Sequence, residues 1–73
     1  MINLSIIIPC FNEDKNIFFL FEKIEKLLEN NSSVEIIIVD NGSTDYTHQK
    51  IISSKLFKKK KINFLKKFKK YSY

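Results

Sequence analysis

The sequence predicts an α/β fold in which parallel strands alternate with helices, in the order β-α-β-α-β. Two runs of β-branched residues, at positions 6–8 and 36–39, are continuous rather than alternating, which is typical of buried strands in a parallel sheet. The stretch between them carries apolar residues at helical spacing. A strand, a helix and a second strand in this order pair in parallel through a right-handed crossover.

The first strand is expected over residues 3–9, because Pro9 cannot donate to a ladder and closes the apolar run. Asn12, Glu13 and Asp14 follow as candidate N-caps, and acids at that position suit the helix dipole. The helix that follows has an apolar stripe with i, i+3, i+4, i+7 spacing. Its members are Ile17, Leu20, Phe21, Ile24, Leu27 and Leu28.

The second strand is expected over residues 34–39, buried on both faces, and the sequence Asp-Asn-Gly at 40–42 ends it in a tight turn. Ser, Thr and Asp at 43–45 are candidate N-caps of a second, weaker helix that runs from residue 44 to about residue 55. We expect its apolar contacts to come from Ile51, Ile52 and Leu56.

Residues 62–65 have two interpretations. Their β-branched and aromatic side chains favour a third strand. The alternative is a basic helix, with Phe57, Phe64, Leu65, Phe68 and Tyr71 roughly on one face. The strand is favoured.

A sheet with its strands in chain order has both crossover helices on the same face. The other face of the isoleucine-rich strands is then uncovered, so we expect self-association through it or a larger domain that covers it.

Charge is distributed very unevenly along the 73 residues. Residues 1–54 hold four lysines and all eight acids, whereas residues 55–73 hold nine lysines and no acid. Such a segment predicts an anionic neighbour, or is simply a solvated terminus. The single cysteine, the absence of a signal peptide and the absence of an apolar run of about 20 residues predict a cytoplasmic protein.

The two loops that leave the carboxyl ends of the first two strands, residues 9–13 and 40–45, are expected to line one crevice, since neighbouring strands lie about 4.8 Å apart. An aromatic ring there can stack on a base, and carboxylates can accept hydrogen bonds from a base or a ribose. The pattern predicts a nucleoside pocket, with no glycine-rich phosphate loop because Gly42 is the one glycine. We expect His48 on the surface and Cys10 as a small apolar filler.

Two motifs then resemble a known family. SIIIPCFNE at residues 5–13, followed by EIIIVDNGSTD at residues 35–45, is similar to the amino-terminal part of family 2 glycosyltransferases, whose GT-A fold opens with strand, P-x-[YF]-N-E, helix, strand and V-D-[DN]-G-S-x-D. The resemblance covers about residues 3–65. It implies a partial, Rossmann-like GT-A domain over residues 1–65, truncated, with a basic tail over residues 66–73.

The family's donor-binding positions fall on five residues of this chain. The resemblance implies that Pro9 and Phe11 flank the base of a nucleotide-sugar, that Glu13 lies near the ribose and that Asp40 accepts a base N–H. Ser43 is a weaker candidate, and a helix cap is the favoured role of Asp45. The implied donor is a UDP-, GDP- or dTDP-sugar, whose sugar passes to an acceptor.

The motifs that complete catalysis in the family do not occur in the sequence. The D-x-D that binds Mg²⁺ or Mn²⁺ is missing, as is the general base, so the resemblance implies a fragment that is inactive by itself. The alternative is a small protein without catalytic activity whose lysine-rich segment, residues 55–70, binds an anionic membrane surface or nucleic acid. Of these two partners the membrane, at its inner face, is favoured.

Overall fold

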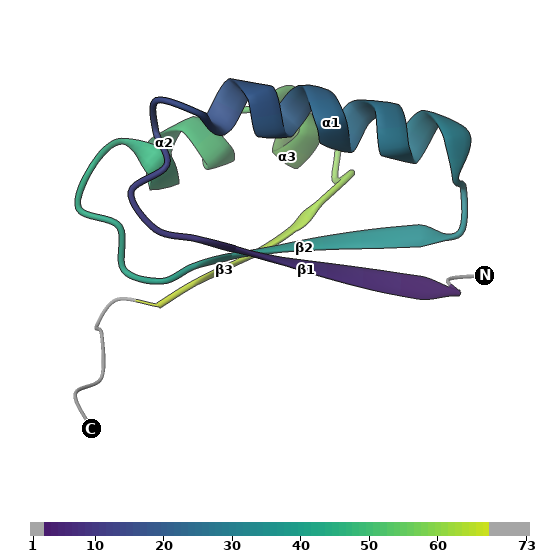
Figure 1. Cartoon of the computed structure of the whole chain (residues 1–73), viewed down its shortest axis with the longest axis horizontal. Coiled ribbons are helices and arrows are strands. Elements are labelled where there is room, and N and C mark those ends of the chain that lie inside the picture. Colours follow the sequence, from purple (N-terminus) through teal and green to yellow (C-terminus); the bar gives the residue numbers. More distant parts are fainter. Residues whose placement is uncertain (1–2, 68–73) are drawn as a thin grey trace.

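A computed structural model describes residues 3–67 of the chain. Within that range, β1 (Leu4–Cys10), β2 (Val34–Asp40) and β3 (Asn63–Lys66) form one parallel sheet in the order β1-β2-β3. The strands are in direct register, so that Ile37 pairs with Ile7 on one side and with Asn63 on the other. Figure 1 shows that the helices lie together on one side of this sheet. The expected α/β order with parallel strands is confirmed.

The helix α1 (Ile17–Asn30) covers the sheet with the apolar stripe that the sequence predicted. Ile17, Phe21 and Ile24 are buried, and the remaining leucines of the stripe are half-buried against the same core. The predicted capping was wrong. Asn16 occupies the N-cap without a side-chain hydrogen bond, and the first turn holds no acid.

The second helix is divided into two short pieces, α2 (Thr47–Ile52) and α3 (Lys55–Lys58). The break lies at two serines whose hydroxyls bond to the preceding turn: Ser53 donates to the carbonyl of Gln49 at 2.7 Å and Ser54 to that of Ile51 at 2.6 Å. Ser54 then has extended backbone and caps α3 by accepting the Phe57 N–H. Serine side chains compete with the helical backbone in this way, so one continuous helix was the wrong prediction.

The third element is a strand, and the basic helix is ruled out for the described residues. Ile62 is buried directly before β3, and the ring of Phe64 packs edge-on against Phe57 with centroids 6.3 Å apart. Phe68 and Tyr71 lie outside the described residues. The described strand ends one residue later than expected, at Lys66.

The core lies between the sheet and the helices, and within residues 3–67 nothing covers the opposite sheet face, as predicted (Figure 1). Ile36 and Ile38 of β2 point into the core and are buried. Their neighbour Ile37 is only half-buried, because β2 is covered on one face and not on both as expected. On the uncovered face, Ile7 is 64% exposed and Leu65 is 60% exposed.

Candidate functional site

The candidate site lies where two loops leave the carboxyl ends of β1 and β2. The strand pairing continues one residue into the second loop, since the Asn41 N–H donates to the carbonyl of Cys10 at 2.8 Å. On the other side of β2, the Lys67 N–H donates to the carbonyl of Asp40 at 2.8 Å. The two loops therefore start at the same edge of the sheet, as Figure 1 shows.

Asp40, the last residue of β2, carries a fully buried carboxylate with 0% of its surface exposed. Its Oδ1 atom accepts two hydrogen bonds from Ser43, from the N–H at 3.0 Å and from the hydroxyl at 2.5 Å. Its Oδ2 atom is buried and has no partner among the described residues. Because a buried acceptor without a partner is costly, Oδ2 is a candidate acceptor for a ligand's donor.

Asn12 connects the two loops through hydrogen bonds with Ser43 and Thr44, which follow Asp40 in the second loop. Its backbone N–H donates to the Ser43 hydroxyl at 2.9 Å, and its Oδ1 atom accepts the Thr44 N–H at 2.8 Å. Asn12 has a φ of +50°, in the left-handed region that asparagine tolerates better than most residues. In the facing turn, Gly42 has a φ of +83°, which glycine adopts without strain.

A second set of hydrogen bonds between the two loops is centred on Asp45 and the buried Thr47. Asp45 Oδ1 accepts the N–H of Thr47 at 2.9 Å and its hydroxyl at 2.6 Å, while Oδ2 accepts the Asp14 N–H at 3.2 Å. The Thr47 hydroxyl in turn accepts the Glu13 N–H at 2.8 Å. Partial desolvation opposes ionisation of Asp45, but these hydrogen bonds prevail and lower the pKa of its carboxyl. The predicted role of Asp45 as a helix N-cap was wrong, because Tyr46 occupies the N-cap of α2 without a side-chain hydrogen bond. Asp45 instead connects Thr47, the first residue of α2, to Asp14 of the first loop.

Cys10 lies at the end of β1, beside the predicted site, and its thiol is poorly ionised. Its side chain is buried, and burial together with the carboxylates of Glu13 and Asp40 raises the pKa of its thiol to about 11. This supports the expected role of filler. His48, expected on the surface, is instead half-buried against the ring of Phe64, with centroids 5.4 Å apart.

The predicted donor-binding residues do not all face the same way. Side chains alternate along a strand, and Pro9 pairs with Val39, so Pro9 and Asp40 project to opposite faces of the sheet. Phe11 is 48% exposed at the start of the first loop, and Glu13 is half-buried in that loop. Hydrogen bonds join Ser43 to Asp40 in the second loop. Pro9 and Glu13 line a separate pocket of about 390 Å³ beside the start of α1, which includes neither Ser43 nor Asp40.

Sequence reasoning missed two residues of the site, Asn12 and Thr47. Asparagine between a strand and a helix is a signal for left-handed backbone, which could have marked Asn12. No comparable signal marks Thr47, because its importance depends on which loop residue faces its hydroxyl.

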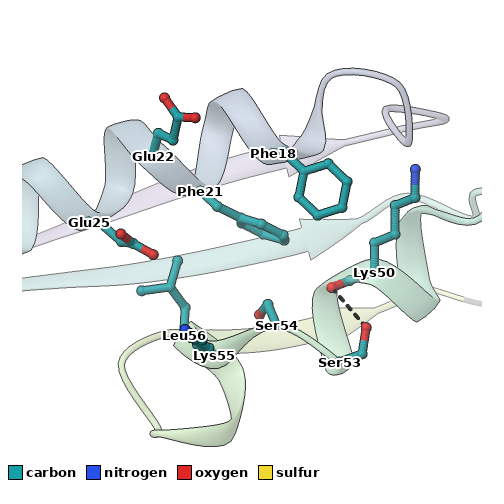
Figure 2. A pocket seen from close by; sticks show the side chains of 9 residues that line it. All are labelled: Phe18, Phe21, Glu22, Glu25, Lys50, Ser53, Ser54, Lys55 and Leu56. Atoms are coloured by element: carbon teal, nitrogen blue, oxygen red, sulfur yellow. Dashed lines mark hydrogen bonds between the residues drawn. The ribbon is translucent and has the colours of Figure 1, made fainter.

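A separate groove of about 300 Å³ lies in the helical layer, between α1 and the α2–α3 pair (Figure 2). Phe18 and Phe21 form its aromatic side, with their rings in an edge-on contact at 6.0 Å. Lys50 reaches over the Phe18 ring at 5.2 Å and donates to the backbone carbonyl of Asp14 at 2.8 Å. The sequence had not predicted this groove, and the bond from Lys50 to Asp14 connects it to the first loop.

Within residues 3–67, no three histidine, cysteine, aspartate or glutamate side chains are grouped so that they could hold a metal ion. No helix of the same range is long and apolar enough to cross a bilayer.

Comparison with known proteins decides the family. The family model of glycosyl transferase family 2 matches residues 5–70, which is nearly the whole chain. The chain belongs to glycosyl transferase family 2. It is also 44% identical over 57 residues to the uncharacterized protein MJ0544 of Methanocaldococcus jannaschii. That match covers 78% of this chain and 22% of the relative. No solved structure gives a significant match.

Proposed function

We propose that the two loops form the base-binding half of a nucleotide-sugar donor site, in a protein whose reaction transfers the sugar to an acceptor. The unpartnered Oδ2 atom of Asp40 is the observation that carries this proposal. A buried carboxylate oxygen can accept a hydrogen bond from a base N–H, and in doing so it gains the partner that none of the described residues supplies.

The chemistry of this acceptor restricts the base. Uracil, thymine and guanine each carry a ring N–H, whereas cytosine and adenine have a ring nitrogen acceptor in the corresponding place, which a carboxylate repels. The proposed donors are therefore UDP-, dTDP- and GDP-sugars. The exposed ring of Phe11 offers a stacking surface for the base, and Glu13 offers an acceptor for a ribose hydroxyl.

Base recognition is the part of the reaction that these residues can supply. Transfer also requires that the charge growing on the leaving diphosphate is neutralised, which Mg²⁺ or Mn²⁺ does when bound. In the described part of the chain, residues 3–67, no three histidine, cysteine, aspartate or glutamate side chains are grouped so that they could hold either ion. We therefore assign no step to a metal and propose that this chain binds the donor nucleotide without catalysing transfer by itself.

Calorimetric titration of the full chain with nucleoside diphosphates tests this proposal. UDP, dTDP or GDP should bind, CDP and ADP should bind at least tenfold more weakly, and chelation of divalent ions should not change the affinities. Asp40→Ala should abolish the binding. The control is Glu22→Gln, which removes an exposed carboxylate on α1 and should leave the affinities unchanged. Undiminished binding by Asp40→Ala would refute the assignment.

A second proposal, peripheral attachment to an anionic membrane, follows from the lysines that begin at α3. Lys58, Lys59, Lys60 and Lys61 are consecutive and exposed. Part of this charge faces acids of α1, because Glu25 and Glu29 line a common groove with Lys59 and Lys61. Sedimentation with phosphatidylserine vesicles at increasing salt concentration tests this proposal. Vesicle binding that is lost at high salt supports attachment, and a lack of vesicle binding at low salt contradicts it.

The uncovered sheet face supports a third proposal, self-association. The exposed side chains of Ile7 and Leu65 lie there, with the half-buried Ile37 and Val39 between them. Ile7→Lys should then convert a dimer or larger species to a monomer in sedimentation velocity. A wild-type monomer at all accessible concentrations would contradict self-association.

A further inference from the structure

We propose that Asn12 is a positioning residue, which acts through Ser43 to fix the buried carboxylate of Asp40 with its Oδ2 atom toward the ligand. The inference rests on the proposed function. It is carried by two consecutive bonds, Asn12 N–H to Ser43 Oγ at 2.9 Å and Ser43 Oγ–H to Asp40 Oδ1 at 2.5 Å, and by a third from the Ser43 N–H to the same oxygen at 3.0 Å.

The role of Ser43 follows from the number of protons that it has to give. A serine hydroxyl has one proton, and Ser43 donates it to Asp40. Its backbone N–H goes to the same oxygen. Both donors are therefore used within the protein, so Ser43 acts on the ligand through Asp40, not as a donor to the nucleotide itself.

Asn12 determines where that hydroxyl lies. Its left-handed backbone, with a φ of +50°, directs the N–H across to the second loop. Its side chain secures this arrangement, because Oδ1 accepts the Thr44 N–H at 2.8 Å. Both groups of Asn12 thus contact neighbouring residues of the turn that holds Asp40, although the two loops are about thirty positions apart in the chain.

Fixing the carboxylate matters because the terminal torsion of an aspartate is broad and roughly two-fold. Two donors on Oδ1 select one orientation and leave Oδ2 as the acceptor. When alanine replaces Asn12 the backbone N–H remains, but the left-handed conformation that directs it to Ser43 is disfavoured and the bond from Thr44 is lost, so the Ser43 hydroxyl turns more freely. The acceptor is then distributed over several directions, and the preference for bases with a ring N–H falls.

The experiment compares the wild-type full chain with Asn12→Ala and Asn12→Asp, using the pairs UDP and CDP, and GDP and ADP, as calorimetric probes. Alanine removes the acceptor for Thr44 and disfavours the left-handed backbone, whereas aspartate keeps both. Asn12→Ala should reduce the affinity for the nucleotide with a ring N–H about tenfold, which is the usual effect of one hydrogen bond. The affinity for its partner nucleotide should change little, and Asn12→Asp should restore most of the wild-type ratio.

The ratio within a pair distinguishes positioning from a purely structural role. An equal loss for both members of a pair, or wild-type affinities in Asn12→Ala, would overturn the inference while leaving the proposed function intact. A wild-type chain that binds none of the four nucleotides would overturn the proposed function as well. If Asn12→Ala does not melt cooperatively, Ser43→Ala replaces it, because it removes only the hydroxyl; an unchanged ratio there also overturns the inference.

Discussion

Thr47→Val is the substitution that tests most sharply how the two loops are held together. Valine has nearly the shape of threonine, so the change removes the hydroxyl and leaves the volume of this fully buried site almost constant. Two bonds are lost: the donation to Asp45 at 2.6 Å and the acceptance from the Glu13 N–H at 2.8 Å. A hydrogen bond to a charged group contributes about 1.5–3 kcal/mol, and a neutral one about 1 kcal/mol. We expect the free energy of unfolding to fall by about 2–4 kcal/mol.

The control for this prediction is Thr44→Val in the same turn. The Thr44 hydroxyl is exposed and lies 3.5 Å from Asn12 Oδ1, so its loss should change the free energy of unfolding by less than about 0.5 kcal/mol. Urea unfolding followed by circular dichroism at 222 nm measures both variants. Equal stabilities of Thr47→Val and Thr44→Val would show that the hydroxyl of Thr47 does not hold the loops.

Two further predictions concern titratable groups near the same loops. A pKa of about 11 leaves Cys10, the one cysteine, with about 100-fold less thiolate at pH 8 than a thiol with the ordinary value of 9.0. Iodoacetamide should therefore modify the folded chain far more slowly than the chain in urea; equal rates would contradict the burial. Asp45 has a lowered pKa, so its stabilising effect is present above the unfolded-state value of about 3.9 and is lost as the pH falls through the folded-state value. Asp45→Asn should lose less stability than wild type between pH 7 and pH 3, and parallel losses would contradict this.

The strands and α1 could be predicted because their signals are local. Continuous β-branched runs fix β1 and β2, and the stripe from Ile17 to Leu28 fixes the face of α1. The division of the second helix at Ser53 and Ser54 was harder to predict. Serine lowers helix propensity only slightly, and two hydroxyl bonds to the preceding turn decided the outcome.

The sequence predicted Asp40 as a site residue, but it did not predict the hydrogen bonds that hold the two loops around it. Asp40 could be found because it ends a buried strand and lies within a motif. The network around it depends on the positive φ of Asn12 and on which backbone N–H faces Thr47 from the other loop. The positive φ of Asn12 has a local signal in the asparagine itself. The contact of Thr47 with the other loop arises only when the two strands pair in register, so no local pattern in the sequence reports it.

The central claim is that the unpartnered oxygen of Asp40 selects a base with a ring N–H, and Asp40→Asn tests it most directly. Asparagine keeps an Oδ1 acceptor for Ser43 and replaces Oδ2 with an amide that donates. The measurement is the ratio of UDP to CDP affinity, or of GDP to ADP affinity, for wild type and variant by calorimetry. We predict that Asp40→Asn reverses the preference, so that CDP binds more tightly than UDP, or ADP more tightly than GDP. A variant that keeps the wild-type preference would contradict the claim.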